Sequence, residues 1–168
     1  GGFRLNIFYE WAMPNRLTFN IKPINKFINT NGLSIDPFSN RKHEFASIHN
    51  DIDPSTDVDS HLCALEFLKS FQDASIDALL YDPPYSLRQL KEVYSGIGLS
   101  LTYEHTTTFF RDIKDQISRV VKPGGIVYSF GWDSVGMGAN RGFKKTDLLL
   151  VCHGGHHHDT IVLKEVKL

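Results

Sequence analysis

The sequence predicts an α/β fold built on one mostly parallel sheet. Short runs of apolar and β-branched residues alternate with segments of helical periodicity, which is the pattern of strands joined by crossover helices. The clearest helical segment, residues 103–121, is followed by Lys122-Pro123-Gly124-Gly125, and Pro and Gly commonly end a helix. The last two apolar runs are separated by a segment that contains Gly154-Gly155, so we expect a C-terminal antiparallel hairpin.

The expected elements follow one another along the chain without a repeat or a linker, so we expect residues 1–168 to form one domain. Helices are expected at residues 65–70 and at residues 103–121, where Phe110, Ile113 and Ile117 repeat at the spacing of one buried face. A third helix is allowed from Asp133 towards Arg141, weakened by two glycines. Strands are expected at residues 33–35, 45–49, 76–81, 126–130, 148–152 and 161–166.

Length, composition and charge narrow the class of protein. Of the 168 residues 41% are hydrophobic and 22% are charged, and no apolar run approaches the roughly 20 residues of a membrane span. The formal net charge of -1 excludes a protein that holds nucleic acid by bulk charge alone. Residues 51–100 are acidic, so a polyanion should be met elsewhere. Two isolated cysteines, and no secretory signal before Trp11, predict a cytoplasmic protein with no membrane association.

Asp82-Pro83-Pro84-Tyr85 carries the clearest chemical signal, because it directly follows an apolar run and ligands of open α/β sheets bind at the carboxyl ends of strands. The Asp82 carboxylate and the Pro83 carbonyl can accept the two N–H bonds of an aromatic amine and localise its lone pair on nitrogen. The prolines hold this carbonyl in place because their φ is fixed. Tyr85 can stack on a base that has been turned out of its helix. The alternative is a turn that only ends the strand.

This tetrapeptide resembles the signature of the amino-methyltransferases that act on exocyclic amines of bases, and the form with Asp is commonest among DNA adenine-N6 methyltransferases. The resemblance implies a Rossmann-like methyltransferase fold with a mixed, mostly parallel seven-stranded sheet. It also implies S-adenosyl-L-methionine as cofactor and DNA as partner. Cytosine N4 and RNA adenine are alternative targets of the same tetrapeptide. Because 168 residues leave no room for a recognition domain, we expect short recognition or a homodimer that completes the site.

The resemblance extends to the cofactor-binding segments. Asp36 and Phe38 match the loop after the family's first strand, and Asp51, with Asp53 as a substitute, stands where family members accept the ribose hydroxyls. The N-terminal segment, residues 1–30, is similar to one that touches the methionine end of the cofactor. Its candidate contact residues are Trp11, Pro14 and Asn15.

Three departures from the family pattern lie near this loop. Asn40 stands where a glycine is expected, and Cys63 replaces an acidic residue of some relatives and is read as a small buried hydrophobe. Only eight residues separate Asp36 from the run at Phe45, so either the crossover helix is reduced to about a turn or the register differs. These departures favour an alternative, a catalytically inactive module of the same fold that binds nucleic acid or a partner, which the intact tetrapeptide opposes.

Two further segments are candidates for substrate contact. Residues 86–103 follow the tetrapeptide as a candidate substrate loop, in which Arg88 and Lys91 could meet phosphates. His156, His157 and His158 lie in the final turn, and because their spacing matches no zinc signature we expect no metal there. If the preceding strand is parallel to the others, this turn reaches the catalytic edge and could touch the substrate backbone or line a base pocket. The alternative is a polar turn whose histidines lie in solvent.

Overall fold

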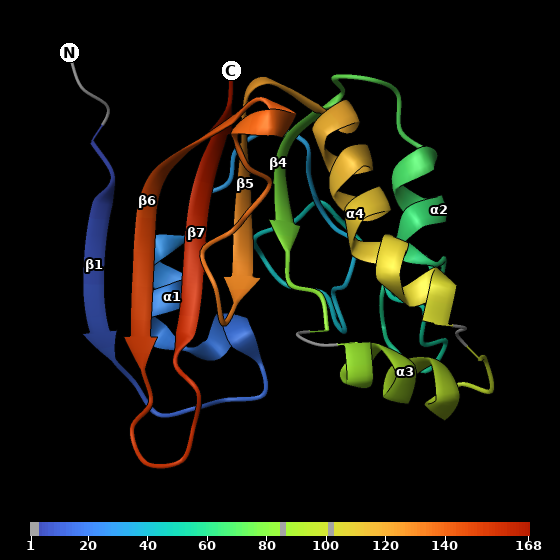
Figure 1. Ribbon diagram of the computed structural model, residues 1–168, viewed down its shortest axis with the longest axis horizontal. Coiled ribbons are helices and arrows are strands. Elements are labelled where there is room, and N and C mark those ends of the chain that lie inside the picture. Colours follow the sequence, from blue (N-terminus) through green and yellow to red (C-terminus); the bar gives the residue numbers. More distant parts are fainter. Residues whose placement is uncertain (1–3, 85–86, 101–102) are drawn as a thin grey trace.

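The computed structural model describes residues 4–84, 87–100 and 103–168, which form one sheet with helices on both faces (Figure 1). The strands are β1 (Asn6–Trp11), β2 (Ser34–Asp36), β3 (Ile48–His49), β4 (Ile76–Tyr81), β5 (Val121–Gly131), β6 (Phe143–Cys152) and β7 (Thr160–Lys167). The α-helices are α1 (Lys22–Phe27), α2 (Ala64–Lys69), α3 (Leu87–Gly96) and α4 (Tyr103–Val120), with short 3-10 turns η1 (Thr18–Asn20) and η2 (Ala139–Arg141).

The strands form one seven-stranded sheet in the order β1-β6-β7-β5-β4-β2-β3. β7 is antiparallel to both β5 and β6, whereas every other neighbouring pair is parallel. The α/β class, the mixed and mostly parallel seven-stranded sheet and the C-terminal antiparallel hairpin are therefore confirmed, and the arrangement is Rossmann-like.

Two predicted elements differ from the structure, namely the strand expected at residues 45–49 and the helix expected at residues 133–141. Residues 37–47, between β2 and β3, contain turns and no helix, and β3 is only Ile48–His49 instead of the expected five residues. The helix expected from Asp133 to Arg141 is wrong, since only η2 forms there. Gly136 and Gly138 both have positive φ, which an α-helix cannot accommodate.

Three other strands or helices, β1, α1 and α3, were not expected from the sequence. β1 adds an edge strand beside β6, inside the segment that was expected to contact a cofactor. α3 occupies most of the candidate substrate loop, residues 86–103. Leu90 and Tyr94, four residues apart, form the buried face of α3, and this i, i+4 spacing could have predicted the helix.

The core is divided by the sheet into two apolar clusters. On one face α2, α3 and α4 pack over β4 and its neighbours, with Leu68, Leu79 and Ile113 fully buried. On the other face α1 packs behind β6 and β7, where Ile24 and Tyr128 are fully buried (Figure 1). Central strand β4 is buried along almost its whole length, so its carboxyl end is held firmly at one edge of the molecule.

Strands that follow β2 in the sequence are added to opposite sides of the β2–β4 pair. β3 is added on one side of β2, whereas β5 and β7 follow on the far side of β4. The carboxyl ends of β2 and β4 therefore flank a switch point, which is where open α/β sheets bind their ligands. The β6–β7 hairpin is at the same edge, because β6 runs parallel to β4 through the intervening antiparallel β7.

Candidate functional site

A cavity of about 400 Å³ lies at this switch point. It is bounded by the segments that follow β2, β3 and β4, together with the N-terminal segment and α3. Its volume falls in the range of small-molecule sites in proteins. The predicted residues Phe38, Asp51, Asp53, Asp82, Pro83 and Pro84 all contribute to its wall.

Asn50 organises the loops that form one side of this cavity. Its side chain is completely buried. Its amide nitrogen donates to the carbonyl oxygens of Pro37 (3.2 Å) and Leu62 (2.9 Å). Its amide oxygen accepts hydrogen bonds from the Ser60 hydroxyl (2.6 Å) and the Leu62 amide (3.0 Å). One buried side chain therefore ties the segment after β2 to the segments on both sides of residues 51–59.

Two carboxylates stand beside this junction in different environments. Asp51 accepts hydrogen bonds from the backbone amides of Asn40 (2.8 Å) and Asp53 (2.9 Å), while burial raises the pKa of its carboxyl. Asp53 accepts from the Ser55 amide (2.9 Å), and this hydrogen bond lowers the pKa of Asp53. Both remain in the cavity wall, so the pair can accept hydrogen bonds from a ligand with hydroxyl donors.

Asn40 has the backbone conformation for which a glycine was expected. Its φ is +58°, in the left-handed region where glycine is favoured and asparagine is the best-tolerated alternative. The amide of Asn40 binds the Asp51 carboxylate at 2.8 Å. Asn40 therefore preserves the turn after β2 that a glycine would form, and it links this turn to the segment after β3.

Asp36 is fully buried and does not line the cavity. One carboxylate oxygen accepts from the Phe38 amide (3.1 Å), and the other lies 2.7 Å from Nε2 of His43. Because Nδ1 of His43 accepts from the Phe45 amide (3.2 Å), Nε2 carries the proton and donates it to Asp36. His49 continues the network, with its ring nitrogen Nδ1 3.2 Å from Asp59. Asp36 thus fixes the loop that carries Phe38 and not a ligand directly.

The tetrapeptide emerges from β4 between two cavities. The Asp82 carboxylate accepts a hydrogen bond from the Thr18 hydroxyl (2.8 Å), which links it to the N-terminal segment. Pro83 and Pro84 line both the 400 Å³ cavity and a second one of about 280 Å³. The Pro-Pro segment is therefore a shared wall. Tyr85 lies outside the described residues.

The second cavity has aromatic walls and a few polar groups. Tyr81, Phe110, Phe130 and Trp132 supply the rings. Lys114 also lines it and donates to the Gly136 carbonyl (2.9 Å), and burial lowers the pKa of this lysine. The hydroxyl of Ser129 is the one buried side-chain polar atom without a partner in the part of the chain that the structure describes. Flat rings with scattered polar atoms suit a planar heteroaromatic ligand.

The hairpin histidines have two different environments. His153 is buried and structural, since its ring contacts the Ala12 carbonyl and the Thr160 hydroxyl, both at 2.8 Å. His158 is exposed and stacks on Trp132 with ring centroids 4.4 Å apart.

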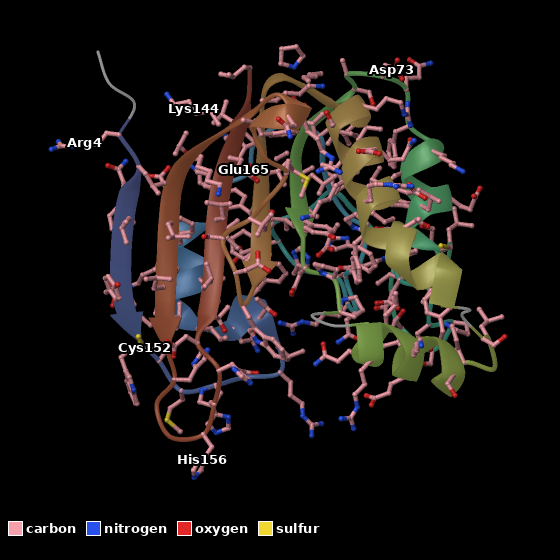
Figure 2. The ribbon with its side chains drawn as sticks, viewed as in Figure 1. Arg4, Asp73, Lys144, Cys152, His156 and Glu165 are labelled. Carbon is pink, nitrogen blue, oxygen red and sulfur yellow. The ribbon has the colours of Figure 1, made fainter. Side chains whose placement is uncertain are left out.

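His157 and His158 line a third cavity of about 220 Å³ together with Pro14, Asn15 and Thr18. His156 is exposed at the hairpin (Figure 2). This hairpin lies at the same edge of the sheet as the tetrapeptide, as expected from the parallel direction of β6.

Three predicted contact residues lie away from these cavities. Arg88 and Lys91 are exposed on α3, and Arg88 pairs with Glu92 (2.9 Å) one helical turn away. Trp11 lines a separate cavity of about 450 Å³ between β1, β6 and α1. That cavity is larger than the one at the switch point, but it shares no residue with the tetrapeptide. The N-terminal segment therefore reaches the switch point through Arg16 and Thr18, not through Trp11.

Several residues of the site were not singled out from the sequence. Asn50, Lys114 and Trp132 come from segments whose spacing gives no signal, whereas Gln89 and Val93 of α3 follow from the missed helix. Cys63 was expected to be a buried apolar residue, but it is only half-buried and its Sγ lies 3.4 Å from the Tyr94 hydroxyl. Within the described ranges no group of His, Cys, Asp or Glu could hold a metal ion, and no helix could span a membrane.

No protein-family model matches the chain, and no curated protein matches it. Among solved structures, the chain is similar to the selenomethionine form of TTHA0409, a proposed DNA modification methylase from Thermus thermophilus. The TM-score is 0.42 at 16% identity, over 61% of this chain and 49% of that one. The chain thus spans about half of the length of that protein.

Proposed function

We propose that this chain is an S-adenosyl-L-methionine-dependent methyltransferase that acts on an exocyclic amine of a nucleic-acid base, namely adenine N6 in DNA. The observation that carries the proposal is the position of Asp82-Pro83-Pro84 at the end of β4, with a cavity on either side and the two prolines shared by both. Two adjoining cavities that meet at one hydrogen-bond-accepting segment suit a group transfer between two bound molecules.

The 400 Å³ cavity has the groups that a cationic nucleoside cofactor needs. Asp51 and Asp53 are acceptors for a ribose diol, and Phe38 adds an apolar wall. Three carboxylates line the cavity, counting Asp82, against one cation among the described residues, Arg16, so its charge favours a sulfonium over a neutral donor. When bound, such a cofactor supplies an electrophilic methyl group. Asp36 and Asn50 act as positioning residues that keep these walls in place.

The chain's own contribution to the reaction is to orient the amine. The Asp82 carboxylate and the Pro83 carbonyl accept its two N–H bonds, which draws the lone pair out of conjugation with the ring and towards the donor cavity. Thr18 restricts the Asp82 carboxylate by its 2.8 Å hydrogen bond. As the new nitrogen–carbon bond forms and the carbon–sulfur bond breaks, the surplus amine proton passes to the Asp82 carboxylate or to water. Tyr85 and the rings of the 280 Å³ cavity would stack on the base.

DNA recognition is assigned to the loops at this edge of the sheet. His156, His157 and His158 would contact the sugar-phosphate backbone beside the target base, a role supported by the stacking of His158 on Trp132. Trp132 lines both the 280 Å³ and the 220 Å³ cavities, so backbone contact and base binding are adjacent. Arg88 and Lys91 would meet more distant phosphates from the outer face of α3. We further propose that the protein works in the cytoplasm.

The test is methyl transfer from radiolabelled cofactor to a panel of DNA and RNA, followed by identification of the modified base. Asp82→Ala should abolish transfer while cofactor binding, measured by calorimetry, persists. Asp57→Ala is the matched control, because Asp57 is an exposed carboxylate outside all of these cavities. Label on cytosine N4 or on RNA would support transfer to an exocyclic amine but would show that adenine in DNA is not the substrate. Unchanged turnover in Asp82→Ala would reject the proposal.

The alternative function is an inactive module of the same fold that binds nucleic acid or a partner. Its main support from the sequence was the missing glycine, and the left-handed backbone of Asn40 weakens that support. Absence of detectable cofactor binding in the unaltered protein would favour the module.

A further inference from the structure

The edge strand β1 is exposed along its entire length. All six of its residues are exposed, including Ile7 (54%), Phe8 (47%), Tyr9 (71%) and Trp11 (64%). Large apolar residues of a monomeric protein are normally scattered over the surface, whereas here they are consecutive on one strand. The strand is therefore a candidate interaction surface.

Exposure on both faces of β1 has a structural cause. Phe8 contacts Phe27 of α1 with ring centroids 6.2 Å apart, so the even-numbered residues face that helix. Ile7 and Tyr9 face the other side, which no helix of the described residues covers because the β5–β6 connection forms only η2 (Figure 1). Ile7 and Tyr9 there adjoin Leu148 and Leu150 of β6 by register.

The outer edge of β1 also has free hydrogen-bonding capacity. β1 pairs with β6 on one side and has no strand on the other among the described residues. Natural edge strands are usually protected by proline, a bulge or charged residues, and β1, Asn-Ile-Phe-Tyr-Glu-Trp, has no proline or bulge and a single charged residue, Glu10. Unpaired amide and carbonyl groups on such a strand can accept a further strand.

We propose that β1 pairs with β1 of a second copy of this chain in an antiparallel, two-fold-symmetric arrangement centred on Ile7. In this register Arg4 stands opposite Glu10 of the second copy, and the symmetry forms this opposite-charge pair twice. Within the described ranges neither Arg4 nor Glu10 has an ion-pair partner in its own chain. Arg4 lies just before the N-terminal end of β1 (Figure 2).

The apolar residues of the uncovered face match each other in the same register. Ile7 stands opposite its symmetry mate, and Tyr9 stands opposite Leu5 of the second copy, all on the face away from α1. The charged pair and the apolar pairs thus favour the same register. A strand from an unrelated protein would need a matching charge and matching apolar residues at the same positions, so a second copy of this chain is the preferred partner. A single pair of short strands buries less than a standard interface, so we expect a dimer with a Kd on the order of tens of micromolar. This inference is independent of methyl transfer.

The first test is a charge swap followed by sedimentation equilibrium from about 5 to 500 μM. The unaltered protein should be dimeric at the upper concentrations. Glu10→Arg and Arg4→Glu should each raise the Kd about tenfold, because each places like charges opposite one another twice. The double variant, Arg4→Glu with Glu10→Arg, should recover the original Kd. A monomer throughout, or a dimer that is indifferent to these charges, overturns the proposal.

The second test reports the register. In a background with Cys63→Ser and Cys152→Ser, Ile7→Cys should form a disulfide-linked dimer under mild oxidation, because directly opposite Cα atoms are about 4.5–5.5 Å apart. Phe8→Cys is the matched control. Its symmetry mate is a diagonal neighbour at about 7–8 Å, beyond disulfide reach. Equal cross-linking of both variants would overturn this register, and circular dichroism verifies that both are folded.

Discussion

Replacing Asn50 with alanine should destabilise the protein more than any comparable surface change. The substitution removes four hydrogen bonds, to Pro37, Ser60 and twice to Leu62, from a side chain that is completely buried. At about 1 kcal/mol for each bond, and with buried partners left unsatisfied, the loss is about 3–4 kcal/mol. Total stabilities are about 5–15 kcal/mol, so the variant should still fold at low temperature.

Urea unfolding followed by circular dichroism measures this loss. With a slope of about 2 kcal/mol per molar urea, the midpoint should fall by about 1.5–2 M at unchanged slope. Asn25→Ala is the control, because Asn25 is exposed and its hydrogen bonds to Phe19 and Glu44 are 3.3 and 3.4 Å long. The control should lose less than about 0.5 kcal/mol. A loss below about 1 kcal/mol in Asn50→Ala would refute the view that this side chain holds the loops together.

Three further predictions concern the proposed site. Thr18→Val removes the hydroxyl that restricts Asp82 while keeping the shape of the side chain, so kcat should fall about tenfold, equivalent to about 1.5 kcal/mol. Thr18→Ser should restore kcat, and an unchanged kcat in Thr18→Val would contradict the orienting role. Asn40→Ala should lose about 1 kcal/mol in the same urea assay because of its positive φ, whereas Asn40→Gly should lose nothing; equal values for the two would contradict the strain argument. Replacing His156, His157 and His158 together with alanine should weaken DNA binding up to about tenfold in a fluorescence anisotropy titration at low salt. Cofactor binding should be unchanged in that variant, and its loss would show that the hairpin is structural.

The sequence predicted the central part of the fold well because strands with buried apolar runs have a strong signal. β4, β5, β6 and β7 were each found as apolar runs, and their hydrogen-bonded order follows the α/β pattern. Edge strand β1 was missed because its apolar residues do not alternate with polar ones, so it lacks the periodicity of a half-buried strand. α3 was missed because the preceding Pro-Pro, Gly96 at its end and Gly98 just after it favoured reading the segment as a loop.

The candidate site was predictable where it follows a strand and not where it depends on tertiary contacts. Asp51, Asp53 and Asp82 come directly after β3 and β4, and all three line the switch-point cavity. Asp36 is the last residue of β2, but the absence of a crossover helix brings His43 against it, and the carboxylate turns inward. Sequence spacing contains no information about such a partner. Trp11 was placed by resemblance alone, and the strand that carries it directs it to a different cavity.

No crossover helix follows β2 or β5, so the loops at the carboxyl edge of the sheet must be held in another way. Where a crossover helix would normally hold the loop after a parallel strand, this protein uses buried polar side chains. Asn50 binds the loop after β2, and the fully buried Glu165 of β7 accepts hydrogen bonds from the amides of Met137 (2.7 Å) and Gly138 (3.0 Å) after β5. Such networks are rigid only when every member is satisfied, so each loop depends on a few buried polar side chains. The lack of a helix between β5 and β6 also exposes apolar surface, because it leaves one face of β1 and β6 uncovered. The feature that shortens the chain around the site is therefore also the one that creates the proposed dimer surface.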